Sequence, residues 1–289
     1  MKPAFSTVAC PDWTFAQVAE KAEQWGYVGC ELRTFGYGSR DIACEPALTS
    51  PAKLRGLLER VGLSICGLAT SIRYDDTITP PIIGLYLDQE SMIRETKACV
   101  DMAVQLEAPF VRVFGFEIVG NEPRNRAIAR IAERLIKCAD YCRNSGVRLL
   151  LENGGSFSRA SELLEVIDKV DSSLLNVAYS LPVARAAGDD LRHGMNALGD
   201  RLAVVKVKDM KAGRPVALGE GELHAKESLQ AAAGVGFDGW LVYEFDRAWL
   251  GAGTVDVSTV MAKSAKFIFD AIGSTGGAAR MARGAASLR

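Results

Sequence analysis

Histidine is scarce in this sequence, with only 2 among 289 residues. His193 lies in a stretch with helical periodicity and His224 follows the segment LGEGE, so neither stands at the end of an apolar run. A zinc cluster built on histidines is therefore not expected. Uninterrupted apolar runs of about 18 residues are also missing, and the N-terminal apolar run is short, so we expect neither a membrane span nor a signal peptide.

An excess of charge of either sign is missing as well. Lys and Arg total 34 against 35 for Asp and Glu, which gives a formal net charge of −1. Without a basic surplus, neither nucleic acid nor an anionic membrane is expected as a partner. The 7 cysteines are scattered and contain no CxxC pair, which is typical of reduced thiols, and we expect a cytoplasmic protein. A homo-oligomer is compatible with the sequence, which does not fix the oligomeric state.

The sequence does contain a regular alternation of apolar, strand-like runs with amphipathic, helical runs. Such alternation is typical of parallel strands joined by helical crossovers. The first strand-like run is not followed by GxGxxG, which disfavours a doubly wound nucleotide-binding sheet. We predict strands over 4–9, 28–33, 63–69, 110–114, 147–152, 174–178, 202–208 and 240–245, and helices over 15–25, 51–61, 89–107, 126–145, 160–169, 183–198, 225–234 and 258–272.

Eight βα units in a chain of this length match the size of a TIM barrel. We therefore predict an α/β fold, a (β/α)8 TIM barrel that forms a single domain over residues 1–273. A disordered, basic tail is expected over 274–289. Four glycines stand between a helical run and the next strand, where a left-handed helix cap is expected: Gly26, Gly62, Gly146 and Gly236.

Polar residues close several of the apolar runs near the C-terminus. Glu152 ends VRLLLEN, Lys206 lies in RLAVVKVKD, and Glu244 ends GWLVYEF. Because the active site of a TIM barrel lies at the carboxyl ends of its strands, these side chains are expected to meet in one pocket. Further residues expected there as substrate-binding groups are Glu31, Arg33, Arg112, Ser180, Lys208 and Trp249.

The residue types at these strand ends indicate acid/base chemistry. Opposed carboxylates such as Glu152 and Glu244 can remove a proton from one face of a carbon and return it to the other, as an epimerase or aldose–ketose isomerase requires. Paired carboxylates also serve glycoside hydrolysis. Lys206 can act as a fixed cation for an enediolate, form a Schiff base with a carbonyl, or simply neutralise a glutamate. The LGEGE segment, residues 218–222, is either a phosphate-binding loop or a plain turn.

The sequence also resembles the xylose-isomerase-like TIM-barrel superfamily of sugar phosphate isomerases and epimerases. The resemblance runs through WGYVGCELR, LEAPFVRVFG, GVRLLLENGG, GDRLAVVKVKD, LGEGEL and GFDGWLVYEFD. It implies a divalent cation held by a glutamate, an aspartate, a histidine and a second glutamate. Glu152 and Glu244 match the two glutamates, whereas Ser180 stands at the aspartate position and Lys206 at the histidine position.

These departures predict a degenerate metal site in which the Lys206 ammonium replaces the metal charge, and no cofactor is expected. If Mn²⁺ or Mg²⁺ did bind, Glu152 and Glu244 would be its ligands. The resemblance implies a sugar isomerase or epimerase that acts on a small carbohydrate or keto-sugar by proton transfer between the two glutamates. Two alternatives are a lyase, decarboxylase or dehydratase that uses Lys206 on a keto-sugar acid, and a non-catalytic sugar-binding barrel.

Overall fold

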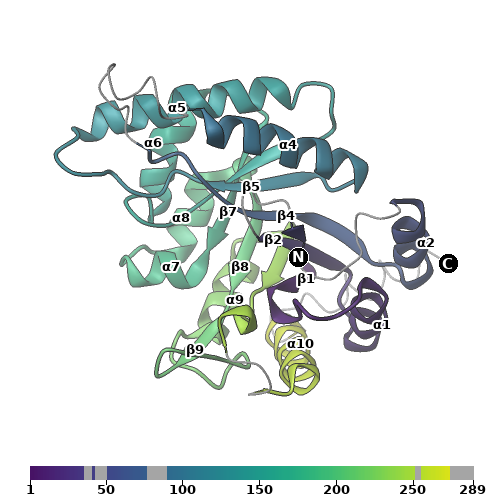
Figure 1. Ribbon diagram of the computed structural model, residues 1–289. Helices are drawn as coiled ribbons and strands as arrows, with labels where there is room; N and C mark the ends of the chain where they lie inside the picture. The colour runs from purple at the N-terminus through teal and green to yellow at the C-terminus, as the bar shows by residue number, and fades with distance from the viewer. Residues whose placement is uncertain (36–40, 43–50, 77–89, 251–254, 274–289) are drawn as a thin grey trace.

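A closed barrel of parallel strands forms the centre of the computed structural model (Figure 1), which describes residues 1–35, 41–42, 51–76, 90–250 and 255–273. Strand β1 pairs in parallel with both β11 and β2, and this double pairing closes the sheet on itself. The predicted (β/α)8 barrel is therefore confirmed. Around the barrel the strands are β1 (Lys2–Ser6), β2 (Gly29–Phe35), β4 (Ser64–Arg73), β5 (Phe110–Phe114), β6 (Arg148–Glu152), β7 (Leu175–Ser180), β8 (Leu202–Val207) and β11 (Trp240–Tyr243).

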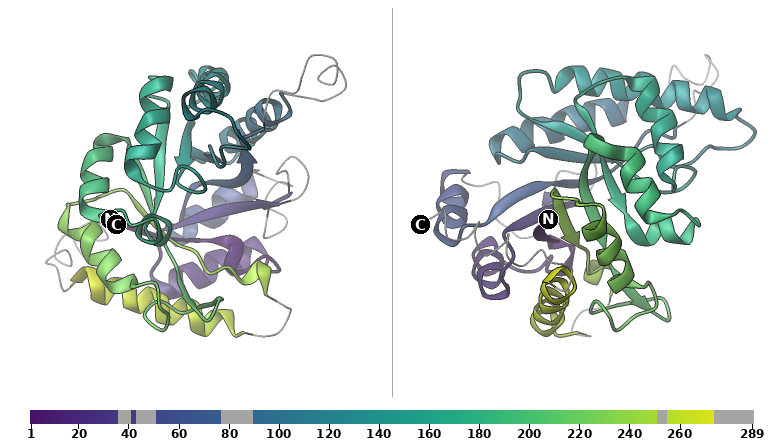
Figure 2. Two further views of the ribbon diagram at one scale, coloured as in Figure 1. Left: turned by 90° about the vertical axis from the view of Figure 1, so that its left-hand side faces the viewer. Right: turned by 180° about the vertical axis from the view of Figure 1, so that it is seen from behind.

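Helices surround the strands and form an outer layer, as Figure 2 shows from two further sides. They follow the barrel strands along the chain, close to where the amphipathic runs predicted them. In order they are α1 (Phe15–Trp25), α2 (Pro51–Val61), α4 (Ser91–Gln105), α5 (Arg124–Tyr141), α6 (Ala160–Val170), α7 (Leu181–Ala186), α8 (Leu191–Leu198), α9 (Ala225–Gly234) and α10 (Val257–Gly273). In the described part of the chain, no helix is long and apolar enough to cross a membrane.

One predicted helix, over 183–198, is in fact two helices, α7 and α8. The break falls at Gly188, whose φ of 76° is incompatible with a continuing right-handed helix. Asp190 then begins α8, because its side chain accepts a hydrogen bond from the backbone N–H of His193 at 2.9 Å. The prediction was wrong here because the helical periodicity of the sequence continues through residues 187–190, where the backbone leaves the helical conformation.

Short elements complete the described chain. They are β3 (Asp41–Ile42), β9 (Asp209–Lys211), β10 (Arg214–Val216), η1 (Thr7–Ala9), η3 (Gly199–Arg201) and η4 (Arg247–Trp249). The four glycines at the predicted helix-to-strand joints all have positive φ values, as expected of left-handed caps: 80° at Gly26, 63° at Gly62, 78° at Gly146 and 71° at Gly236. The tail predicted over 274–289 lies outside the described residues.

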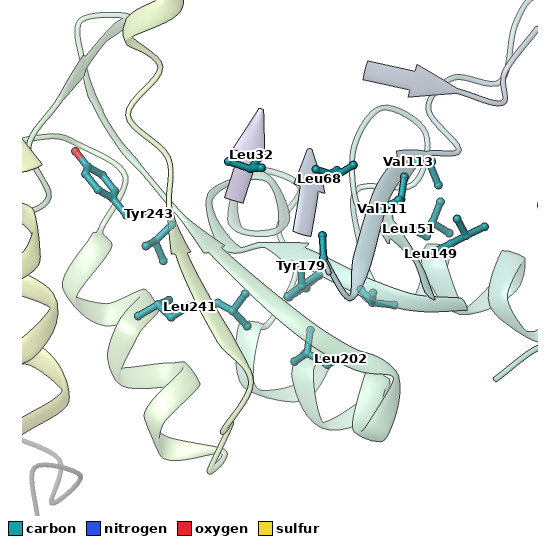
Figure 3. Packing of buried hydrophobic residues seen from close by; sticks show 14 of the residues in the cluster. Leu32, Leu68, Val111, Val113, Leu149, Leu151, Tyr179, Leu202, Leu241 and Tyr243 are labelled. Atoms are coloured by element: carbon teal, nitrogen blue, oxygen red, sulfur yellow. The ribbon is translucent and has the colours of Figure 1, made fainter. Parts of the chain in front are cut away.

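Apolar side chains occupy both faces of the barrel strands. On the outer face, residues such as Leu32, Leu149 and Leu241 are fully buried beneath the helices (Figure 3). A separate, smaller cluster fills the lumen and consists of Ala4, Cys66, Phe110, Leu150, Ala178, Val204 and Val242. Because side chains alternate along a strand, the residues two positions further toward the carboxyl ends of β5, β6, β7, β8 and β11 also face the lumen. The apolar lumen thus leads directly to the polar strand ends.

Candidate active site

Lys206 is the most deeply buried charged residue at the carboxyl ends of the strands, with 1% of its surface exposed. It follows Val204 by two positions on β8, so its side chain faces the same lumen. On either side it is in register with Ser180 of β7 and Val242 of β11. An ammonium in this position requires compensating charge, because burying an unpaired ion costs several kcal/mol.

Three carboxylates provide that compensation. The Nζ atom of Lys206 lies 2.8 Å from Oε1 of Glu244, 2.9 Å from Oε2 of Glu152 and 2.9 Å from Oε1 of Glu31. An ammonium has three N–H donors, so each carboxylate can take one of them. Nζ donates hydrogen bonds to Oε2 of Glu31 at 3.1 Å and to Oε1 of Glu244 at 2.8 Å, and its contact with Glu152 is an ion pair.

Arg112 supplies a second cation to the same cluster. It comes from β5, which pairs with β6, and its Nη1 atom lies 3.1 Å from Oε2 of Glu152. Its guanidinium also lies over the ring of Phe114, at 4.5 Å from the ring centroid. The Nε atom is enclosed and has no hydrogen-bond partner among the described residues. Glu152 is thus held by two cations, and one donor of Arg112 is unused.

The cluster shifts the protonation equilibria of its members in opposite directions. Burial raises the pKa of Glu31 and the neighbouring charge of Glu244 adds to this, although Lys206 opposes the shift. Burial would also raise the pKa of Glu244, but the charges of Lys206 and Arg112 outweigh it and lower that pKa to about 2. Burial opposes the charge of Lys206, yet the surrounding carboxylates raise its pKa above the usual value. Lys206 is therefore an ammonium at neutral pH, and Glu244 is a carboxylate.

A cavity of about 190 Å³ opens above this cluster. Glu152 and Glu244 form part of its wall, whereas Lys206 and Glu31 are not among the residues that line it. Because charged side chains of both signs line the wall, the cavity suits a small polar ligand. Its other lining residues are Val8, Arg33, Arg112, Phe114, Lys208 and Asp246.

The other residues predicted for the site lie partly in the cavity wall and partly outside it. Arg33, Arg112 and Lys208 line the cavity, and Lys208 lies 3.1 Å from Asp246. Glu31, predicted to bind substrate, instead contacts Lys206 beneath the cavity. Trp249 belongs to η4, but its side chain lies outside what the structure describes.

Ser180 closes β7 and is 2% exposed. The amide of Asn153 holds its backbone: the Ser180 N–H donates to Oδ1 at 2.6 Å, and Nδ2 donates to the Ser180 carbonyl at 3.1 Å. Ser180 does not line the cavity. Sequence reasoning missed both Asn153 and Asp246, although each lies within two residues of a predicted glutamate, in the phrases LEN and EFD.

The LGEGE segment is closed by a side chain of this chain. The carboxylate of Asp209 accepts hydrogen bonds from the backbone N–H groups of Gly219 at 2.9 Å, Gly221 at 3.1 Å and Leu223 at 3.0 Å. Asp209 is 2% exposed. The amides that a phosphate would need are therefore already used, and the plain-turn interpretation describes this loop better.

An ammonium takes the position between Glu152 and Glu244 where a cation shared by both would lie. Among the described residues, no group of three or more His, Cys, Asp or Glu is arranged to hold a metal ion. The charged side chains at the site are carboxylates, arginines and lysines, and no histidine is among them.

Comparisons with known proteins agree with this architecture. The model of the family described as "Xylose isomerase-like TIM barrel" matches residues 19–270. Fructoselysine 3-epimerase of Shigella flexneri is 22% identical over 236 residues, which cover 77% of this chain and 82% of that protein. The solved structure of an L-ribulose 3-epimerase superposes with a TM-score of 0.76 at 14% identity, covering 96% of this chain and 97% of the other. The crystal structure of IOLI protein with a bound zinc atom superposes with a TM-score of 0.71 at 15% identity, covering 95% and 99%.

Proposed function

Because the chain belongs to the xylose isomerase-like TIM-barrel family, we propose that it is an isomerase or epimerase acting on a small sugar or keto-sugar derivative. One observation carries this proposal: Glu152 and Glu244 both line the cavity, and both contact the Nζ atom of Lys206. The similarity to fructoselysine 3-epimerase and L-ribulose 3-epimerase supports a reaction at a carbon next to a carbonyl group.

In the proposed reaction, one glutamate removes a proton from the carbon next to the carbonyl and the other glutamate delivers a proton to it. Glu244 is in the ionised form that a proton acceptor requires, because the charges of Lys206 and Arg112 hold its pKa at about 2. The proton donor must be protonated before it acts, and Lys206 connects both glutamates to Glu31, whose pKa is raised mainly by burial. Glu31 is therefore the carboxyl of the cluster best suited to store a proton.

Lys206 is proposed to act through the two glutamates rather than on the substrate. It lies beneath the cavity, its pKa is raised, and a carboxylate is available to each of its three N–H donors. A protonated amine is not a nucleophile, so these features disfavour a Schiff base, and with it the lyase or decarboxylase alternative that depends on one. Arg112 lines the cavity and is the better placed donor for an enediolate oxygen.

We further infer that this site works without a divalent metal ion. The family resemblance implies such an ion, but the residues present do not fit one, because the Lys206 ammonium lies where the ion would contact both glutamates. A metal there would face the charges of Lys206 and Arg112 at short range. The ammonium instead supplies one positive charge that fixes the two carboxylates.

Exchange of substrate hydrogen with solvent deuterium tests this proposal. A panel of small ketoses and keto-sugar acids is incubated with the protein in D₂O, and NMR follows deuterium at the carbon next to the carbonyl. Glu152→Gln and Glu244→Gln are each expected to slow exchange by roughly 10²–10⁴-fold, because each removes one acid/base group. Glu165→Gln, in an exposed ion pair with Arg124, is the matched control and should leave exchange unchanged.

Two outcomes would contradict the proposal. Exchange that is equally fast in wild type and in both cavity variants would remove the two glutamates from the chemistry. Ligands that bind to the wild type without any exchange or turnover would indicate the non-catalytic sugar-binding barrel instead.

A further inference from the structure

Arg33 differs from the other cations of the cavity wall in having no acidic partner. Arg112 pairs with Glu152 and Lys208 pairs with Asp246. Arg33 donates from Nη1 to the carbonyl of Ala69 at 2.6 Å and from Nη2 to Oγ of Ser71 at 2.6 Å, and both acceptors are neutral. In the described part of the chain, no carboxylate forms an ion pair with Arg33. The wall therefore contains one cation whose charge is not compensated at contact distance.

The surroundings of Arg33 make this lack of compensation costly. Burial, followed by repulsion from Arg112, lowers the pKa of Arg33 to about 10, far below the usual value for a guanidinium. Both arginines line the same cavity, and the enclosed Nε of Arg112 has no hydrogen-bond partner. Two neighbouring guanidiniums of this kind form a site that an anion stabilises.

The charge of the whole site points the same way. The four cations Arg33, Arg112, Lys206 and Lys208 balance the four acids Glu31, Glu152, Glu244 and Asp246 only when all eight groups are ionised. Burial raises the pKa of both Glu31 and Asp246, so protonation of either one leaves the site positive. A ligand with one negative charge would restore the balance.

We propose that the substrate carries a carboxylate that binds between Arg33 and Arg112, so that the substrate class is a keto-sugar acid. This inference rests on the proposed function of the same cavity. Arg112 would then contact the carboxylate while it remains 3.1 Å from Glu152. A carboxylate in contact with Arg112 then lies close to Glu152, and in a 2-keto acid the carboxylate carbon is two bonds from the carbon that exchanges its proton. A cavity of about 190 Å³ matches such a small ligand.

Paired ligands that differ only in this group provide the test. D-fructose and 2-keto-D-gluconate share the C2 carbonyl and the configuration of the following carbons, but C1 is a hydroxymethyl group in the first and a carboxylate in the second. Isothermal titration calorimetry of the wild-type protein is expected to show at least about tenfold tighter binding of 2-keto-D-gluconate, as one charge-assisted contact provides. This comparison needs no variant, so it does not depend on how a variant folds.

Variants then assign the preference to Arg33. Arg33→Met is expected to abolish the preference, because it weakens binding of 2-keto-D-gluconate far more than binding of D-fructose. Arg33→Lys should retain part of it, because an ammonium keeps the charge but not the planar fork. Arg73→Met is the matched control: Arg73 ends β4, pairs with Asp75 and does not line the cavity. It should retain the full preference.

Equal affinity of the wild type for the two sugars, or a preference for D-fructose, would overturn the proposal. D-fructose 6-phosphate is titrated in parallel, and tighter binding of this ligand than of 2-keto-D-gluconate would overturn the carboxylate in favour of a phosphate. Deuterium exchange separates this inference from the proposed function. A carboxylate preference without exchange would contradict only the proton-transfer proposal, whereas exchange on D-fructose without a carboxylate preference would contradict only this inference.

Discussion

Lys206 and Glu244 form the shortest ion pair of the barrel's charged cluster, with 2.8 Å between Nζ and Oε1. The pair joins neighbouring strands, β8 and β11, at the end of an apolar lumen. Because the same Nζ atom also contacts Glu152 and Glu31, one ammonium fixes three carboxylates that would otherwise repel one another.

Replacing the ammonium should destabilise the fold strongly. Lys206→Met leaves three buried carboxylates with Arg112 as their nearest remaining cation, and breaking a buried ion pair costs about 3–5 kcal/mol. Urea denaturation should show a loss of this size in the free energy of unfolding. A second substitution, Glu31→Gln, should recover part of the loss by removing one of the uncompensated charges. If the single variant were as stable as wild type, the carboxylates would not depend on Lys206.

Acid stability should depend on Glu244. Its pKa is about 2 in the folded protein against 4.5 as the ordinary value, so folding favours its ionised form. This contribution is fully present above about pH 4.5 and is lost as the pH falls toward 2. The free energy of unfolding of Glu244→Gln, followed by denaturation between these pH values, should therefore fall less steeply with acid than that of wild type. Glu165→Gln, in an exposed pair, should retain the wild-type slope.

Removal of metal should leave the activity intact. The Lys206 ammonium lies between the two glutamates, so we expect far less than one Mn²⁺, Co²⁺ or Zn²⁺ per purified chain and no loss of deuterium exchange after dialysis against a chelator. Elemental analysis and the exchange assay measure these two quantities. About one tightly bound metal ion per chain, together with inactivation that added metal reverses, would contradict this expectation.

The loop after β8 should depend on Asp209. Its buried carboxylate accepts hydrogen bonds from the amides of Gly219, Gly221 and Leu223. Asp209→Asn removes the charge and makes one oxygen into a donor, so we expect a loss of about 1.5–3 kcal/mol in the free energy of unfolding. Limited proteolysis should also become faster within 209–223. Glu222→Gln, in the same loop, is the control, and equal stability of both variants would contradict this role of Asp209.

Much of the fold could be predicted because the residue types in a strand depend on what covers its two faces. Strands covered on both faces must be nearly continuous in apolar residues, and the predicted range 110–114 is the same as β5. Where a boundary depended on a cap, prediction failed, as at Gly188 between α7 and α8. The cap is a matter of local backbone conformation, which the helical periodicity does not encode.

The sequence by itself determined which polar residues close the strands and that Lys206 stands where the family resemblance implies a histidine. Only the tertiary structure decided what these residues contact. Glu31 lies 175 positions from Lys206 in the chain, yet their side chains touch, because the pairing of β1 with β2 and β11 closes the barrel and brings β2 and β8 to the same lumen. The same closure places Lys206 below the cavity and leaves Arg33 without an acidic partner. Such pairings depend on distances between strands that are remote in sequence, and no pattern within a single strand contains them.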